Sequence, residues 1–372
     1  MQENGQNTRA ATAPDKVVII PAYEPTENFI LYLKELTETD ICAVIVVNDG
    51  SNETFDAIFS QVETMPKCTL LRHDVNRGKG AALKTAFDYC LVHFPENTVY
   101  VTADSDGQHL VNDVLRVAEE AAEYPDALVL GTRNFNKAGV PFRSRWGNRW
   151  TSLFFRFVHG IKVKDTQTGL RGFSYGLLTH LLDINGDRFE YEMNMLIATS
   201  KWDVPLRQVP IETVYNAEGL VSHFQTLRDS GLIMRAVFGS LGMYFLSSLI
   251  SAVADVLIFL FLNNVIDIPG IFGCPVAWHV PIAKGVARVL SSIINVYFNF
   301  RYVFHGKGAL SIVKYYILWA CQLVASSAGV TLMIEVLHVP QVLSVIIVDL
   351  TLALISYQIQ KHWVFKNKEV SR

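Results

Sequence analysis

The sequence has no paired cysteine motif, little charge and no apolar run at its start. The five cysteines include no CxxC pair, which argues against a zinc cluster or a disulfide framework and fits a reducing compartment. Only 18% of the 372 residues are charged, below the level of about a quarter that soluble proteins usually show, so apolar residues must be concentrated somewhere. Residues 1–15 are polar, which predicts a disordered tail, no signal peptide and an N-terminal part that stays in the cytoplasm.

The charge is unevenly distributed, and no basic tract is present. The net charge is −3, and residues 236–372 hold 9 Lys and Arg against 5 Asp and Glu, so the longer N-terminal part is acidic. An acidic part without a basic tract argues against a nucleic-acid partner.

Residues 16–131 alternate short apolar runs with longer amphipathic patterns. This alternation predicts an α/β domain with a Rossmann-like, doubly wound sheet and helices on both faces. Ligands of such sheets bind beyond the carboxyl ends of the strands. We expect buried parallel strands at 17–20, 43–47, 69–71, 99–103 and 127–130, and helices at 28–38, 79–94 and 112–124.

Four apolar segments follow residue 236, each about 20 residues or longer and therefore able to cross a bilayer as a helix. Basic residues lie in 301–314 and in the C-terminal tail, whereas the other two connections carry none. The positive-inside rule then predicts an all-α membrane domain of four helices with both termini in the cytoplasm. The segments are 239–262, 280–300, 312–334 and 340–360.

The membrane part contains an internal repeat. Residues 295–304 (NVYFNFRYVF) correspond to residues 356–365 (SYQIQKHWVF) at a spacing of 61. An ordinary interfacial belt of aromatic residues is the alternative, but the agreement in order and spacing favours a duplicated helical hairpin.

The repeat also relates two charges inside the apolar segments. Arg288 corresponds to Asp349, and a lone charge in the hydrocarbon costs about 2.5–3.5 kcal/mol or more. We therefore hypothesise an Arg288–Asp349 ion pair between helices, with Asp255 and Lys284 as alternative partners. The other possibility is that each charge faces a polar cavity or the lipid by itself.

Two carboxylates follow the fourth expected strand, in the segment DSDGQH. Asp104 and Asp106 are separated by Ser105 alone, so both can reach one cation, and Gln108 offers a further oxygen. Mg²⁺ or Mn²⁺ holding a diphosphate fits this set of hard oxygen ligands. A solvated acidic turn is the alternative interpretation.

Further polar groups follow other strands. PAYEP and NDGS end the first two strands and suit the edge of a nucleotide base, although NDGS is also ordinary turn chemistry. NRGKG opens a helix whose N-terminal N–H groups favour an anion or form a simple cap. Residues 142–157 carry two stripes at helical spacing, which favours a membrane-surface helix over a core-facing one. The stripes are Trp146, Trp150, Phe154 and Phe157, and Arg145, Arg149 and Arg156.

Residues 16–235 resemble family-2 glycosyltransferases of the polyprenyl-phosphate, dolichol-phosphate mannose synthase-like type, and residues 236–367 resemble the GtrA-like membrane family. The first resemblance rests on the ordered motifs PAYEP, NDGS, NRGKGAALKTAF, DSDGQH, GTR and DTQTGLRGF. It implies a GT-A fold and inverting transfer from a nucleotide sugar (GDP-mannose, UDP-glucose or UDP-N-acetylglucosamine) to undecaprenyl or dolichyl phosphate. It also implies a multi-pass cell-membrane protein with a cytoplasmic catalytic domain, and it is compatible with a homo-oligomer.

The resemblance assigns roles by position. The sequence departs from the family in two nucleoside motifs, with Pro25 in place of a glutamate and Asn48 in place of an aspartate. The implied catalytic residues are Asp104, Asp106 and Arg133, and the implied Mg²⁺ or Mn²⁺ ligands are Asp104, Asp106 and Gln108. The implied nucleotide-sugar contacts are Pro21, Tyr23, Glu24, Val47, Asp49, Lys79, Asp104 and Ser105. The implied acceptor-phosphate contacts are Arg145, Arg149, Arg228 and Arg235.

Two rival functions share parts of these patterns. A processive polysaccharide synthase should carry a QxxRW motif before its spans, and the Arg-Trp steps at 145–146 and 149–150 lack the required glutamine. A lipid-linked sugar transporter with a merely nucleotide-binding domain would not need an intact DSDGQH.

Overall fold

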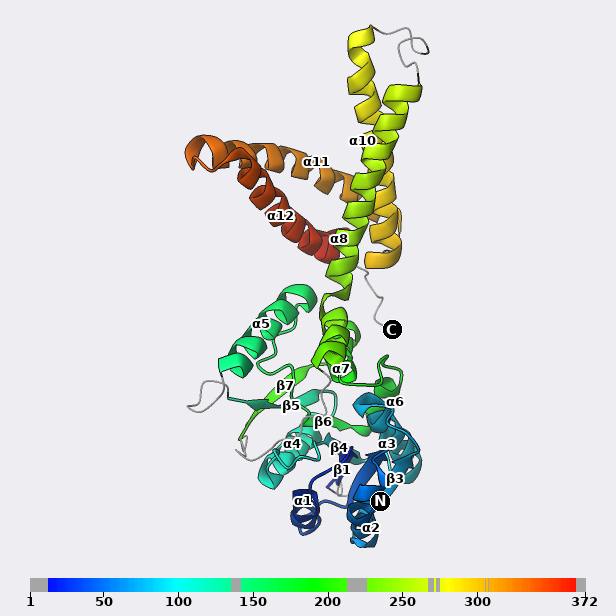
Figure 1. Cartoon of the computed structure of the whole chain (residues 1–372). Coiled ribbons are helices and arrows are strands. Elements are labelled where there is room, and N and C mark those ends of the chain that lie inside the picture. The colour runs from blue at the N-terminus through cyan, green and yellow to red at the C-terminus, as the bar shows by residue number, and fades with distance from the viewer. Residues whose placement is uncertain are drawn as a thin grey trace, which may run out of the picture. The chain divides into compact units, whose positions relative to one another are not determined.

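The computed structural model describes residues 13–134, 142–212, 226–266, 271, 275–304, 306 and 308–365. The chain divides into two compact units, Met1–Val237 and Phe238–Arg372 (Figure 1). Most of the expected disordered tail lies outside the described residues, although the first strand already begins at Asp15.

The first unit is built on a mixed sheet of seven strands in the order β3-β2-β1-β4-β6-β5-β7. Only β6 runs antiparallel to its neighbours, β4 and β5. The strands are β1 (Asp15–Ala22), β2 (Ala43–Asp49), β3 (Cys68–His73), β4 (Thr98–Thr102), β5 (Leu128–Arg133), β6 (Arg171–Ser174) and β7 (Leu206–Ile211).

All five expected strands are present, but the expectation of a wholly parallel, buried sheet is wrong in two respects. Strand β6 inserts antiparallel between β4 and β5, and its short sequence, RGFS, gives no apolar run by which to find it. Strand β3 is only half-buried because it lies at the edge of the sheet. Strand β7 was also missed, since LRQVPI mixes polar and apolar residues.

Helices pack on both faces of the sheet, as expected. Apolar side chains of α1, α2 and α4 form a core with one face. On the other face Phe87 of α3 packs against Phe173 of β6, with ring centroids 5.4 Å apart. The helices are α1 (Asn28–Thr37), η1 (Glu53–Phe55), α2 (Asp56–Thr64), α3 (Lys79–His93), α4 (Val111–Glu123), α5 (Phe142–His159), α6 (Tyr175–Leu182) and α7 (Glu190–Trp202).

The second unit is helical. It contains most of α8 (Thr226–Val265), followed by η2 (Val276–Trp278), α10 (His279–Phe298), η3 (Asn299–Val303), α11 (Leu310–Thr331), η4 (Leu332–Val336), α12 (Gln341–Ile359) and η5 (Gln360–Val364).

Among the described residues, three helices are long and apolar enough to cross a membrane: Gly231–Val265, Leu310–Val336 and Gln341–Val364. The expectation of four is therefore wrong. Helix α10 forms where the second span was expected, but Lys284, Arg288 and its polar residues lower its mean hydropathy. The prediction that both termini lie on the same side of the membrane was based on four spans, and three candidate spans do not support it.

The hairpin of α8 and α10 and the hairpin of α11 and α12 are duplicates, as the repeat predicted. The π-helical segments η3 and η5 begin at Asn299 and Gln360, positions that the 61-residue spacing makes equivalent. Asn299 Nδ2 donates a hydrogen bond of 3.1 Å to Gln360 Oε1. The equivalent rings of Phe304 and Phe365 stack with centroids 5.2 Å apart. Equivalent residues therefore meet at one end of this unit.

The hypothesis of an Arg288–Asp349 pair within the chain is wrong. Lys284 Nζ lies 2.5 Å from Asp255 Oδ2, and Arg288 Nη1 lies 3.8 Å from the same oxygen. Asp349 accepts a hydrogen bond of 3.0 Å from Ser326 Oγ on α11 instead. Asp255, the alternative partner of Arg288, is confirmed. Asp255 lies on α8, which is the helix beside this part of α10 (Figure 1).

Candidate active site

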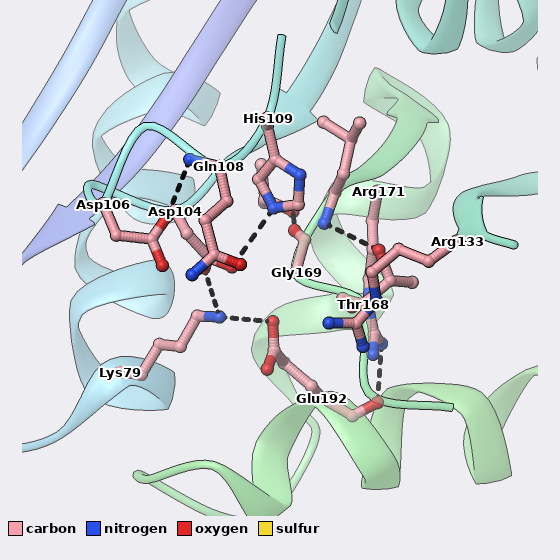
Figure 2. Close-up of polar contacts among 12 residues, drawn as sticks. Lys79, Asp104, Asp106, Gln108, His109, Arg133, Thr168, Gly169, Arg171 and Glu192 are labelled. Atoms are coloured by element: carbon pink, nitrogen blue, oxygen red, sulfur yellow. Dashed lines mark hydrogen bonds and ion pairs between the residues drawn. The ribbon is translucent and has the colours of Figure 1, made fainter. Parts of the chain in front are cut away.

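The acidic segment 104–109 follows β4 at the carboxyl edge of the sheet, where the sequence analysis placed it. Gly107 has a φ of 70°, which lets the chain turn tightly. Asp106 Oδ1 accepts a hydrogen bond of 3.0 Å from the backbone N–H of Gln108. Figure 2 shows Asp104, Asp106 and Gln108 close together beside Lys79.

Lys79 lies between two carboxylates. Its Nζ is 2.6 Å from Asp104 Oδ1 and 2.8 Å from Glu192 Oε1 (Figure 2). Burial by itself would lower the pKa of Lys79, but Asp104 and then Glu192 outweigh it and raise that pKa. Lys79 is therefore a permanent cation beside the acidic segment. Sequence reasoning did not assign Glu192, since FEYEM gives no means of choosing it over Glu190.

The two aspartates have opposite electrostatic surroundings. Burial works to raise the pKa of Asp104, but Lys79 and His109, whose Nε2 lies 3.2 Å from Oδ2, outweigh it and hold that pKa well below its usual range. Burial, and then the charge of Asp104, raises the pKa of Asp106. Asp106 is thus the carboxylate that most needs another cation nearby.

The donor set fits a hard divalent cation such as Mg²⁺ or Mn²⁺. Asp104, Asp106 and Gln108 offer only oxygen ligands of the kind that these ions prefer. In the described part of the chain, no three His, Cys, Asp or Glu side chains are grouped closely enough to hold a metal by themselves. The remaining ligands would therefore be substrate oxygens and water, as is usual for Mg²⁺.

The loop before β6 closes the site from the other side. Thr102 Oγ1 donates a hydrogen bond of 2.8 Å to the carbonyl oxygen of Gly169, which holds the loop against β4. A Cβ at Gly169 would lie 2.5 Å from both carboxylate oxygens of Asp104. Only glycine lets the backbone approach this carboxylate so closely.

Arg171 joins that loop to helix α7. Its side chain is completely buried, with Nε donating to the carbonyl oxygen of Thr168 at 3.1 Å and Nη1 to that of Glu192 at 2.6 Å (Figure 2). Arg171 thereby fixes the backbone of Glu192 and so helps to hold the Glu192 carboxylate beside Lys79. It is a positioning residue that sequence reasoning did not single out.

Arg171→Met should lower the melting temperature of the full chain, because two buried carbonyl groups lose their donor and nearby carboxylates lose a cation. Each hydrogen bond donated by a charged group is worth about 1.5–3 kcal/mol, and Arg171 donates two of them to buried carbonyl groups. Thermal unfolding of the detergent-solubilised protein measures the effect. Arg72→Met is the control, since Arg72 makes a surface pair with Glu63 and should matter little. Equal melting temperatures for the two variants would contradict this role.

A cationic pocket of about 670 Å³ lies where β5 ends beside α5. Arg133 is held there by completely buried Asp165, with Nε–Oδ2 and Nη2–Oδ1 distances of 2.7 and 3.0 Å. No described carboxylate forms an ion pair with the other three cations of the pocket, so the pocket carries excess positive charge. The lining residues are Thr132, Arg133, Asn134, Arg145, Asn148, Arg149, Ser152, Lys164 and Pro210.

The expected phosphate contacts are thus only partly brought together. Arg145 and Arg149 line the same pocket as Arg133, and Lys164 is an addition that its isolated position in the sequence did not signal. Arg235 is exposed on α8 and is not a lining residue. The side chain of Arg228 lies outside the described residues.

The expected nucleoside contacts lie at the ends of β1 and β2. Pro21 and Val47 are register partners in the sheet, and the N–H of Glu24 donates a hydrogen bond of 2.8 Å to Ser51 Oγ, which ties the two following loops together. Tyr23, the residue before Glu24, is half-buried. These contacts remain predictions.

Asp49 has a role that its motif did not indicate. Its carboxylate accepts hydrogen bonds from the backbone N–H groups of Arg77 (2.9 Å) and Gly78 (2.8 Å) and lies 2.7 Å from His73 Nδ1. Asp49 therefore anchors the loop that leads into α3 and positions Lys79. At the start of α3, the N–H of Ala81 already donates a hydrogen bond to the carbonyl oxygen of Asp187. This N–H group is therefore not available to bind an anion.

Helix α5 exposes its aromatic stripe. Ring centroids of Trp146 and Trp150 are 6.0 Å apart, and those of Trp150 and Phe154 are 5.8 Å apart. These three side chains are between 36% and 48% exposed, whereas Phe155 and Val158 face the core. The core-facing alternative for the stripe is therefore wrong.

Family models match both units. The model of glycosyl transferase family 2 matches residues 17–181, and that of the GtrA/DPMS transmembrane domain matches residues 236–365. An uncharacterized protein of Methanocaldococcus jannaschii is 30% identical over 231 residues, which span 59% of this chain and 92% of that protein. The chain belongs to glycosyltransferase family 2. It is a glycosyltransferase of the dolichyl-phosphate sugar transferase type with a multi-pass membrane domain.

Two further comparisons concern a named enzyme and a solved structure. The UDP-N-acetylglucosamine–dolichyl-phosphate N-acetylglucosaminyltransferase of Methanococcus voltae is 28% identical over 224 residues, 54% of this glycosyltransferase and 87% of that enzyme. Glucosyl-3-phosphoglycerate synthase of Mycobacterium tuberculosis superposes with a TM-score of 0.44 at 16% identity, over 61% of this chain and 79% of that one. The mixed sheet is GT-A-like, as family 2 membership implies.

Proposed function

We propose that this glycosyltransferase moves a sugar, with inversion, from a nucleotide sugar to a polyprenyl phosphate such as dolichyl or undecaprenyl phosphate. The observation that carries the proposal is the cationic pocket, in which Arg145, Arg149 and Lys164 have no described carboxylate partner. Arg133 ends β5, which runs in the same direction as β4, so Arg133 and the acidic segment lie at the same edge of the sheet. The relative from Methanococcus voltae, whose name specifies a dolichyl-phosphate acceptor, supports the same acceptor class.

The donor is proposed to lie at the edge formed by β1, β2 and β4. Tyr23, Glu24 and Asp49 would line the nucleoside site, and Asp104, Asp106 and Gln108 would hold Mg²⁺ or Mn²⁺. When bound, the metal supplies positive charge that stabilises the leaving nucleoside diphosphate. Pro21, Val47 and Ser105 complete the proposed donor contacts.

Lys79 supplies a second positive charge beside the donor site. It is held by Asp104 and Glu192 and remains protonated because both carboxylates raise its pKa. A fixed cation at this place lowers the energy of a transition state in which negative charge moves to the leaving group.

The acceptor needs positioning more than activation. A phosphate monoester is largely ionised near neutral pH, since its second pKa is about 6, so the reaction requires little proton abstraction. Arg145, Arg149 and Lys164 would bind this dianion, and Asp165 keeps Arg133 oriented toward the pocket. The exposed aromatic stripe of α5 would rest on the membrane surface and bring the pocket to the lipid.

The catalytic unit is proposed to face the cytoplasm. Ser240 Oγ near the start of the membrane part of α8 lies 2.7 Å from Tyr357 OH, so α8 enters this part at the end where the two π-helical segments meet. Arg301, Lys314 and Lys361 are at the same end. Basic residues at one end of a membrane domain favour the cytoplasmic side. Labelling of a cysteine placed at Lys314 in sealed vesicles tests this orientation.

Incubating membranes that contain the protein with radiolabelled nucleotide sugars and a polyprenyl phosphate tests the proposed reaction. Label should enter the organic phase as a lipid-linked monosaccharide. Label in a long water-soluble polymer would support a processive synthase, and binding of donor without any product would support a transporter with a nucleotide-binding domain. A panel of GDP-mannose, UDP-glucose and UDP-N-acetylglucosamine identifies the donor.

Arg145→Ala and Arg149→Ala should each raise KM for the polyprenyl phosphate by about tenfold or more, as expected for a lost charge-assisted hydrogen bond. KM for the nucleotide sugar should change little. Steady-state kinetics with each substrate varied in turn measures both. Arg156→Ala is the matched control, because Arg156 lies on the same helix but outside the pocket. If donor KM rises and acceptor KM does not, the pocket binds the donor instead.

A further inference from the structure

Two opposite charges are left exposed on the helices of the membrane unit. The Arg288 side chain is 54% exposed, and its only described ionic neighbour is Asp255, which Lys284 already neutralises at 2.5 Å. Asp349 on α12 is also exposed, and its described partner is the neutral hydroxyl of Ser326. The first hairpin, formed by α8 and α10, thus carries an excess positive charge at Arg288. The second hairpin, formed by α11 and α12, carries an excess negative charge at Asp349.

These two charges lie at the same level along equivalent helices. Arg288 is eleven residues before Asn299, and Asp349 is eleven residues before Gln360. At 1.5 Å per residue, each lies about 16 Å from the end where Asn299 and Gln360 are hydrogen-bonded. The two charges therefore occupy equivalent places on the two hairpins, and neither has a full counter-charge of its own among the described residues.

We propose that a second copy of this chain joins these charges, with Arg288 of one copy paired to the partner's Asp349. In a two-fold symmetric arrangement the same pair forms twice, since each copy contributes both residues. Exposed apolar residues accompany each charge and would pack in the same contact. They are Val289 and Ile293 on α10, and Ile346 and Leu350 on α12.

Exchange of the charges between copies tests the proposal. Copies with Arg288→Asp carry two negative charges at the contact, and copies with Asp349→Arg carry two positive charges. Each variant alone should lose self-association by at least about tenfold, or about 1.4 kcal/mol. When the two variants are co-expressed with different affinity tags, they should co-purify as mixed oligomers, because every contact then joins opposite charges.

Recovery in the mixture is the decisive result, because misfolded copies cannot produce it. Full-length protein in lipid nanodiscs is used throughout, and oligomeric state is read by native mass spectrometry. Lys314→Asp, a charge reversal elsewhere in the same unit, should leave self-association unchanged. A monomeric wild type, or two variants that do not recombine, would overturn the proposal. Loss of bound phosphatidylglycerol from Arg288→Asp with unchanged oligomeric state would also overturn it, because a lipid phosphate then neutralises Arg288.

Discussion

Replacing Asp106 with asparagine is expected to lower kcat by about two to three orders of magnitude, the usual effect of removing one electrostatic group from a transition-state site. Asp106 has no described lysine, arginine or histidine ion-pair partner, while burial and the charge of Asp104 raise its pKa. These properties suit a carboxylate whose partner is a divalent cation. The neutral amide keeps the size of the side chain and removes the charge that holds the ion.

The Asp106→Asn effect is measured with saturating donor and acceptor over a range of Mn²⁺ concentrations. Direct Mn²⁺ binding, followed by electron paramagnetic resonance, should weaken in parallel. Asp126→Asn, which changes an exposed carboxylate in the turn before β5, is the control and should behave as wild type. Full activity in EDTA, or near-normal turnover of Asp106→Asn, would refute the metal assignment.

Gly169→Ala is expected to reduce kcat about as strongly as Asp106→Asn does, while the free energy of unfolding stays close to that of the wild type. The added Cβ would lie 2.5 Å from both oxygens of the Asp104 carboxylate, so that carboxylate must move. Moving it breaks the 2.6 Å contact with Lys79 and the 3.2 Å contact with His109. Misplacing a catalytic group by about 1 Å can cost about a hundredfold in rate.

The comparison with Gly176→Ala isolates this cause. A Cβ at Gly176 meets only Ser174 Oγ at 3.7 Å, an ordinary contact, so this variant should keep normal activity. Mn²⁺ affinity and melting temperature are measured for both variants alongside kcat. A Gly169→Ala protein with wild-type kcat would show that Asp104 need not stay where the structure places it. A large fall in its melting temperature would indicate a structural defect instead.

The five apolar strands and the acidic segment could be predicted because each has a local signal. A continuous apolar run marks a buried strand, and Asp104 and Asp106 are neighbours in the chain. Strand β6 and the Lys79–Glu192 contact could not be predicted, because the partners are far apart in sequence and carry no pattern of their own. The same holds for Lys164, which reaches the pocket through the loop between α5 and β6.

The sequence alone therefore determined the two-part organisation, the family resemblance, the site segment and the duplicated hairpin, because composition, motif order and a 61-residue spacing are properties of the linear chain. Only the tertiary structure decided which charges meet. Arg288 shares Asp255 with Lys284 instead of pairing with Asp349. Asp49 is engaged by the loop before α3, and Arg171 is buried between two carbonyl groups. Ion pairs and hydrogen bonds depend on distances of a few ångströms between separate elements, and those distances are fixed only when the elements pack.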